Sequence, residues 1–300
     1  MLFSVIIPNL NSPIIDETLV SLKHQRFDRA HFEVIVVGVD APGLVKTDEL
    51  VKFEQWESAL SPAAARNRGA ALAGGEVLAF TDADCVASPD WLAIFAELFS
   101  DPAVAVIGGG VVFEANSYWG LADNLGTFYE SLASRPSRTR NQLPALSLAV
   151  RRELFQEMGG FDERYPRPAG EDSDLTFRLH RRGYTLYFEP RASVLHRPQR
   201  NNMRDTLRHG FVQGKYSIKV DPRYAREAGL PWPLGTRLGV ILAAPLLAVG
   251  ATSRVFMTNP RFLRYWYAAP AILAQKLAWC VGAAMRPRNR DFAKGARSDA

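Results

Sequence analysis

Two aspartates one residue apart, Asp82 and Asp84, are the residues whose types and spacing most clearly suggest chemistry. They follow the apolar run from Val77 to Phe80, which is typical of a buried parallel strand, and open α/β sheets bind ligands at the carboxyl ends of such strands. Two carboxylates this close can share a hard divalent cation, which commonly also holds phosphate oxygens of a nucleotide. The pair therefore suggests a metal and nucleotide site. The alternative is an ordinary turn in which aspartates accept hydrogen bonds from backbone amides.

The elements that must position this pair alternate between strand and helix patterns. Strands are predicted over residues 3–7, 33–37, 76–81 and 104–107, and helices over 14–24, 62–73 and from Pro89 to just before Asp101. The run from Gly108 to Gly110 predicts a bend or bulge, and residues 118–140 are expected to begin as an aromatic helix and end in an arginine-containing loop. The alternation indicates an α/β fold with a mostly parallel central sheet flanked by helices.

Composition limits the kinds of partner. The 300 residues are 47% hydrophobic, which is enough for a large core, and the net charge of +5 favours anionic partners such as sugar diphosphates or lipid head groups. No zinc-finger or helix-turn-helix spacing is present, so nucleic acid is not expected as a partner. Cys85 and Cys280 are too few for a disulfide framework. The stretch from Met1 to Pro8 lacks a basic region, which predicts a strand and no signal peptide.

Several short motifs occur in one order along the chain. They are Ser4 to Pro8, Ala65 to Gly69, Asp82 to Asp84, Gly159 to Glu163, Glu171-Asp172, and Val194 to His196. With these motifs the chain resembles the family 2 glycosyltransferases of the GT-A fold, over roughly residues 3 to 200, and the combination is more specific than any single motif. The resemblance implies an inverting transfer of a sugar from a nucleoside diphosphate donor to an acceptor hydroxyl.

The same resemblance assigns the metal side of the site. Asp84 is expected to bind Mg²⁺ or Mn²⁺ directly, with Asp82 beside it and nearer the ribose or donor sugar. His196 matches a position that can supply a further metal ligand. A single histidine after a strand also commonly packs in the protein without binding metal.

Glu171 and Asp172 open a predicted helix that ends at Gly183. The resemblance makes Asp172 the general base and Glu171 its neighbour on the acceptor side. Without it, both acids would simply complement the helix dipole, and Asp174 is expected to act only in that way. A helix N-terminus should lower the pKa of Asp172, whereas an efficient base titrates near the working pH.

Binding of the donor nucleotide is expected from five further positions. Pro8 and Asn9 end the first strand, where the base is expected, and the resemblance places Arg66 and Asn67 beside the nucleotide. An exposed helix arginine is the alternative for Arg66. The family usually has an acidic pair directly after the second strand, but here Asp40 comes a residue or two late. The base it reads is therefore open, and a UDP-sugar is taken as the default donor.

The C-terminal third points to a membrane surface. A basic amphipathic connector over 201–230 precedes an apolar region over 231–285 and a basic tail over 286–300. The uncharged stretch from Leu238 to Ser253 would make a helix of about 24 Å, short of a hydrocarbon core of about 30 Å. Interfacial or re-entrant helices therefore fit better than a spanning pair. A soluble oligomer that buries these helices is the rival interpretation.

These observations predict a catalytic domain over 1–200 at the cytoplasmic face of a membrane, acting on a lipid-linked or other envelope glycan. A sugar-phosphate nucleotidyltransferase is a second candidate, but it needs a basic, glycine-rich loop after the first strand, and Asn9 to Pro13 is not one. A non-catalytic membrane scaffold is a third. The presence of Asp82, Asp84 and Asp172 argues against it.

Overall fold

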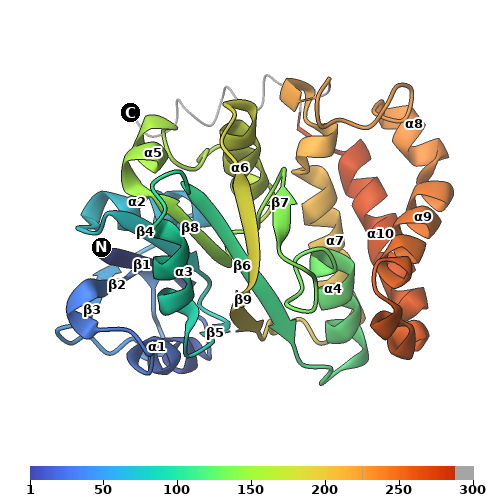
Figure 1. Ribbon diagram of the computed structural model, residues 1–300. Helices are drawn as coiled ribbons and strands as arrows, with labels where there is room; N and C mark the ends of the chain where they lie inside the picture. Colours follow the sequence, from blue (N-terminus) through green and yellow to red (C-terminus); the bar gives the residue numbers. More distant parts are fainter. Residues whose placement is uncertain (225, 288–300) are drawn as a thin grey trace. The chain divides into compact units, whose positions relative to one another are not determined.

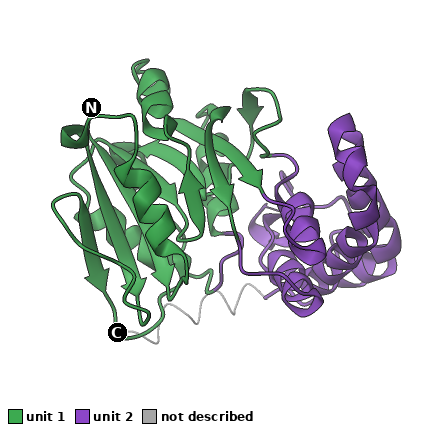
Figure 2. Cartoon of the chain, turned by 90° about the horizontal axis from the view of Figure 1, so that it is seen from below, with its two compact units in different colours: residues 1–113, 131–166, 171–197 green, residues 114–130, 167–170, 198–300 purple. Residues whose placement is uncertain are grey.

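The computed structural model describes residues 1–224 and 226–287, which form two compact units (Figure 2). Unit 1 contains residues 1–113, 131–166 and 171–197. Unit 2 contains residues 114–130 and 167–170 together with the described residues from 198 onward. Residues 114–130, which the sequence placed within the catalytic domain, thus belong to the unit of C-terminal helices. Of the predicted basic tail, residues 288–300 lie outside the described residues.

Unit 1 is built on one mixed sheet (Figure 1). Its described strands are β1 (Phe3–Leu10), β2 (Phe32–Val39), β3 (Val51–Gln55), β4 (Val77–Thr81), β5 (Cys85–Ala87), β6 (Val106–Phe113), β7 (Arg138–Arg140), β8 (Ser147–Arg151) and β9 (Leu186–His196). Their order is β3-β2-β1-β4-β8-β6-β9-β5, and β7 pairs with β9. The half from β3 to β4 is parallel, as predicted, whereas β8 runs antiparallel to both β4 and β6. The expectation of a mostly parallel sheet therefore holds for the half that ends at β4.

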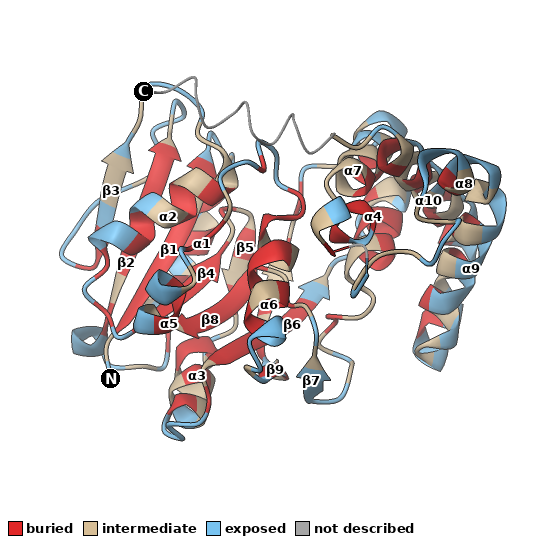
Figure 3. Ribbon diagram, turned by 90° about the horizontal axis from the view of Figure 1, so that it is seen from above, coloured by how far each residue is buried: buried red, intermediate tan, exposed pale blue. Residues whose placement is uncertain are grey.

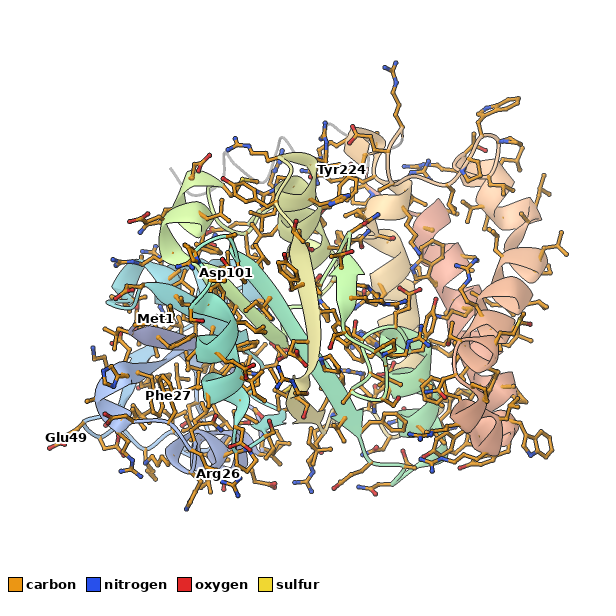
Figure 4. The ribbon with its side chains drawn as sticks, viewed as in Figure 1. Met1, Arg26, Phe27, Glu49, Asp101 and Tyr224 are labelled. Carbon is orange, nitrogen blue, oxygen red and sulfur yellow. The ribbon has the colours of Figure 1, made fainter. Side chains whose placement is uncertain are left out.

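Helices cover both faces of this sheet. They are α1 (Ile15–Lys23), α2 (Pro62–Leu72), α3 (Trp91–Phe99), α5 (Arg152–Glu157) and α6 (Glu171–Arg181). On one face, Ile6 and Phe80 share a buried cluster with Phe155 of α5 and Leu175 of α6. On the other face, the ring of Phe3 packs edge-on against Phe99 of α3 and against Phe27, which Figure 4 labels. Unit 1 is thus a three-layer α/β structure.

Local sequence explains the elements nearest the site. Helix α2 begins at Pro62 because the Ser61 hydroxyl accepts a hydrogen bond from the Ala64 amide, and proline suits the first helical turn. The predicted irregularity at the glycine run is confirmed, since the pairing of β6 with β9 shifts register between Gly109 and Val111.

Unit 2 is a helical bundle around one central helix. It contains α4 (Tyr118–Phe128), α7 (Met203–Lys215), α8 (Arg237–Leu242), α9 (Ala244–Met257), the 3₁₀ segment η4 (Pro260–Ala268) and α10 (Ala269–Ala284). Helix α10 contacts α4, α7, α8 and α9. Helices α7 and α10 approach very closely, because a Cβ at Gly214 would lie 1.9 Å from the Trp279 carbonyl oxygen and one at Gly282 would lie 1.9 Å from that of Phe211.

The apolar stretch after residue 237 is divided at Ala243 into α8 and α9. Within residues 1–224 and 226–287, no helix combines the length and the apolar composition needed to cross a bilayer.

A buried polar network joins three helices of unit 2. The side chain of Asp123 on α4 has no solvent exposure, and its carboxylate accepts hydrogen bonds from Arg200, His209 of α7 and Gln275 of α10 at 2.6–2.8 Å. Burial alone would raise the pKa of Asp123. The charges and hydrogen bonds of His209 and Arg200 outweigh burial and hold that pKa well below its usual range.

Candidate active site

The acidic pair lies in the turn between β4 and β5. One ligand atom each from Asp82, Asp84 and Cys85 lies within 4.8 Å of the others. Burial, with the nearby charges of Asp84 and Asp82, raises the pKa of the Cys85 thiol well above its usual range, so this group stays protonated and is a poor ligand for a hard cation. Cys85 itself is fully buried.

The pairing of β5 with β9 sets Cys85 opposite His196, and His196 Nε2 lies 3.8 Å from Asp84 Oδ2. Asp84 thus lies near both of the other predicted metal ligands, although the group whose ligand atoms all lie within 4.8 Å of one another contains Cys85 and not His196. The two carboxylates are oxygen donors of the kind that suits Mg²⁺ or Mn²⁺.

Ser12 is a residue of this site that the sequence did not single out. Its hydroxyl donates a 2.7 Å hydrogen bond to the Ala83 carbonyl oxygen, in the middle of the acidic turn. The bond ties the loop after β1 to that turn. The polar cluster directly after the first strand is the signal that could have indicated it.

The ends of β1 and β2 lie next to each other, where the donor base was expected. The Asn9 side chain donates to the Val39 carbonyl oxygen and accepts from the Ser12 amide, so it fastens the two strand ends together. Gly38, with φ of 137°, leaves the necessary room, because a Cβ there would lie 1.9 Å from the Asn9 carbonyl oxygen. Pro8 lies beside Asn9 and opposite Val37 of β2.

Asp40 follows β2, and only one of its two carboxylate oxygens accepts a hydrogen bond in the described part of the chain. Its Oδ2 accepts a hydrogen bond from the Val45 amide at 2.7 Å, whereas its Oδ1 is buried and has no hydrogen-bond partner in the described part of the chain. Buried polar atoms are normally paired, so this oxygen is suited to an N–H donor of a ligand. A role in reading a base stays a prediction.

Arg66 connects the two acidic halves of the site. Its guanidinium donates to Asp82 Oδ1 at 2.7 Å and to Glu171 Oε1 at 2.9 Å, and only 4% of the side chain is exposed. The alternative of an exposed helix arginine is therefore wrong. Because the sequence separates the two partners widely, nothing in the motifs alone indicated this bridge. Direct contact of Arg66 with a nucleotide stays a prediction.

Asn67 holds the turn that contains the glycine pair. Its amide nitrogen donates to the Phe161 carbonyl oxygen and to Glu163, and its amide oxygen accepts from the Phe161 backbone. Gly160, with φ of 68°, fits closely here, since a Cβ would lie 2.6 Å from the Asn67 oxygen. The geometry thus gives Asn67 a role in shaping this turn, and its predicted contact with the nucleotide remains untested.

Glu171 and Asp172 begin α6, as predicted. The Asp172 carboxylate accepts hydrogen bonds from the Ala145 and Ser173 amides, at 3.2 and 2.7 Å. Glu171 uses one oxygen to bind Arg66, and its Oε2 is buried with no hydrogen-bond partner in the described ranges. Asp174, expected only to complement the helix dipole, pairs with Arg178 one turn along at 2.8 Å.

Burial determines the acidity of this pair. Burial and the neighbouring charge of Asp172 raise the pKa of Glu171 to about 7, against the opposing effect of Arg66. Burial also raises the pKa of Asp172, although Arg66 and two backbone amides favour its charged form. The expectation that the helix N-terminus lowers the pKa of Asp172 is therefore wrong, because desolvation is the larger effect.

The sheet is of the GT-A type and has an acidic turn after β4. A buried arginine joins this turn to the acidic start of a helix. This arrangement is typical of the nucleotide-sugar transferase class of folds. Residues 4–158, about half of the chain, match the family model described as Glycosyl transferase family 2. The chain belongs to glycosyl transferase family 2.

Relatives support this assignment. The chain is 31% identical over 196 residues to the pre-mycofactocin glycosyltransferase of Mycobacterium tuberculosis (strain ATCC 25618 / H37Rv), and the match covers 63% of the chain and 40% of the relative. It is 28% identical over 230 residues to the glycosyltransferase AglE of Haloferax volcanii, covering 72% of the chain and 73% of AglE. The chain thus spans less than half the length of the mycobacterial relative.

Solved structures share the fold at low sequence identity. The mannosyltransferase PcManGT from Pyrobaculum calidifontis, in complex with GDP-Man and Mn²⁺, is similar with a TM-score of 0.59 and 20% identity, over 91% of this chain and 85% of that one. GalNAc-T7 with UDP, GalNAc and Mn²⁺ is similar with a TM-score of 0.50 and 18% identity, over 74% of this chain and 51% of that one. Both establish the GT-A fold of this chain.

Proposed function

We propose that the protein is a metal-dependent, inverting glycosyltransferase that moves a sugar from a nucleoside diphosphate donor to an acceptor hydroxyl. The bridge from Asp82 through Arg66 to Glu171 carries this proposal, because it makes the metal side and the acceptor side parts of one site. Two neighbours of the same fold are Mn²⁺ complexes with a nucleotide or nucleotide sugar, which supports the choice of ligands.

Each side chain has a distinct part in the proposed transfer. Asp84, Asp82 and His196 would hold Mg²⁺ or Mn²⁺, and the metal would neutralise charge on the departing diphosphate. Asp172 accepts the proton of the acceptor hydroxyl as the new C–O bond forms at the anomeric carbon. The bond from that carbon to the diphosphate oxygen breaks, and its electron pair leaves with the nucleoside diphosphate. A single displacement of this kind inverts the configuration at the anomeric carbon.

Arg66 keeps the geometry of these groups fixed. It pairs with both Asp82 and Glu171, and its positive charge offsets part of the cost of holding the two carboxylates close together. It thereby leaves Asp172 as the carboxylate for proton transfer. Glu171 Oε2 remains available to a hydroxyl group of the acceptor.

The proposal names the donor base and the acceptor only by their chemical class. The default donor is a UDP-sugar, with Asp40 Oδ1 as the acceptor for an N–H group of the base. The acceptor is proposed to be a lipid-linked or other envelope glycan, met at the cytoplasmic face of a membrane. The apolar C-terminal helices support this location.

A thermal-shift screen with nucleoside diphosphates and nucleotide sugars tests the donor site. A matching donor with Mn²⁺ or Mg²⁺ at about 100 times its Kd should stabilise the protein by about 2.7 kcal/mol. Asp84→Asn should lose that shift, and Asp90→Asn, which changes an exposed aspartate, should keep it. If no nucleotide shifts Tm, the proposal is wrong. NMR of the product's anomeric proton then decides between inversion and retention.

A further inference from the structure

Helices α8 and α9 carry an apolar stripe that faces solvent. It consists of Leu238, Leu242, Leu246, Val249 and Met257, and we call it the outer stripe. From Leu238 to Val249, successive members are three or four residues apart. Met257 follows two helical turns later, and the exposed Ser253 lies midway between Val249 and Met257. The members therefore lie on one side of the two helices. The most exposed are Met257 at 82% and Leu246 at 79%.

The opposite side of the same helices is already used. Val240, Ala248 and Val255 are fully buried there, and α10 contacts both helices. In Figure 3 much of α8 and α9 is coloured as exposed. A surface helix in water normally has a polar outer face, but α9 has Arg254 as its single charged residue. The outer stripe is therefore apolar surface that the core of unit 2 does not need.

The segment of chain that contains the outer stripe has charges of one sign. No Asp or Glu occurs from Ala228 to Pro287, whereas Arg237, Arg261 and Arg264 are exposed. The segments on either side of α8 and α9 also expose Trp232, at 85%, and Trp266, at 71%. Exposed leucines with arginine and tryptophan but without carboxylates match the chemistry of an anionic lipid surface, which supplies the missing negative charge.

We propose that the outer stripe is the surface by which unit 2 enters the interface of an anionic bilayer, with α8 and α9 lying parallel to the membrane plane. One side of these helices packs on α10 and the other is free to enter lipid, which fits a helix lying flat at the interface. The inference depends on the proposed membrane location and not on the transfer chemistry, so either can fail without the other.

Co-sedimentation of the full chain with vesicles tests this proposal. We expect binding to vesicles of phosphatidylcholine mixed with phosphatidylglycerol, and weaker binding to phosphatidylcholine alone. Leu242→Glu with Leu246→Glu should weaken binding to both by at least about 100-fold, since two leucines no longer enter the apolar phase. Arg261→Gln with Arg264→Gln should weaken only the binding to anionic vesicles, by about 30-fold.

The control is Val20→Glu with Leu72→Glu, which changes two exposed apolar residues of unit 1, each 52% exposed. This variant should bind vesicles like the unchanged protein. All variants alter exposed side chains, so circular dichroism and the donor-induced thermal shift should be preserved.

The proposal is overturned if the outer-stripe variant still binds vesicles like the unchanged protein, or if the unchanged protein binds neither vesicle type. A dimer in ultracentrifugation that the outer-stripe variant dissociates, without any vesicle binding, would instead make the stripe a contact between copies. Loss of the donor shift with vesicle binding retained would contradict the transfer reaction alone.

Discussion

Asp172 illustrates how one carboxylate can be kept both oriented and reactive. Two backbone amides hold its oxygens, while burial raises its pKa and makes it a stronger base than an exposed aspartate. Asp172→Asn keeps the shape and the hydrogen bond from the Ala145 amide. We expect it to lower kcat by about 100- to 10,000-fold and to leave the donor-induced thermal shift intact.

The matched control for this variant is Glu157→Gln, which removes an exposed carboxylate of α5. It should transfer sugar at the normal rate. Normal turnover by Asp172→Asn would rule out its role as the base.

We predict that replacing Arg66 with lysine impairs sugar transfer. The guanidinium donates to Asp82 and Glu171 from two different nitrogens, and a single ammonium group cannot reproduce this fork. Arg66→Lys should lower kcat/KM by about 100-fold. Arg68→Lys, two residues along the same helix and exposed, is the comparison and should remain close to normal.

The pH dependence of transfer should show the raised pKa of the acidic pair. Asp172 accepts a proton only when it is ionised, so kcat falls as the pH drops. Because burial raises the pKa of Asp172, the fall should occur at a higher pH than the value of about 4 expected for an exposed aspartate. A kcat profile with its midpoint near pH 4 in the unchanged protein would contradict this account.

At the scale of elements, regular patterns could be predicted and long-range pairings could not. Most of the strand and helix alternation up to Thr81 followed from apolar runs and turn residues, and so did the irregularity at Gly109, but strand β3 was missed. Strand β7 was missed because Arg138 to Arg140 is polar and largely exposed, and it is a strand only through pairing with β9. The bridge of Arg66 and the locking role of Asn67 depend on partners far along the chain, which motif spacing does not show.

The Asp123 network is predicted to stabilise unit 2. Asp123→Asn removes a charge that Arg200 and His209 share inside the bundle, so it should lower the free energy of unfolding by about 3 kcal/mol. The pKa of Asp123 is depressed in the folded protein, so its contribution is present above the unfolded pKa of about 4 and is lost as the pH falls further. Urea denaturation measures both effects.

Asp205→Asn, at the exposed start of α7, should change stability by no more than about 0.5 kcal/mol. Equal stabilities of the two variants would mean that the network contributes little.

At the scale of the whole molecule, the sequence predicted a catalytic α/β region and an apolar helical region. It did not predict that residues 114–130 would join the C-terminal helices. The reason is physical: α4 packs on α10 and holds the buried Asp123, and Gln275, which reaches Asp123, comes from a distant segment. Labelled segments of Figure 1 make the bundle around α10 easy to follow.

The chain from Ala228 to Pro287 contains neither carboxylates nor histidines. These are the groups that change charge between about pH 4 and pH 7, so the arginines of this region keep the same positive charge through acidification. Ionic strength acts differently, because the range of these charges shrinks from about 10 Å at 0.1 M salt to about 3 Å at 1 M. Salt, and not acidity, is therefore the signal to which this part of the surface can respond.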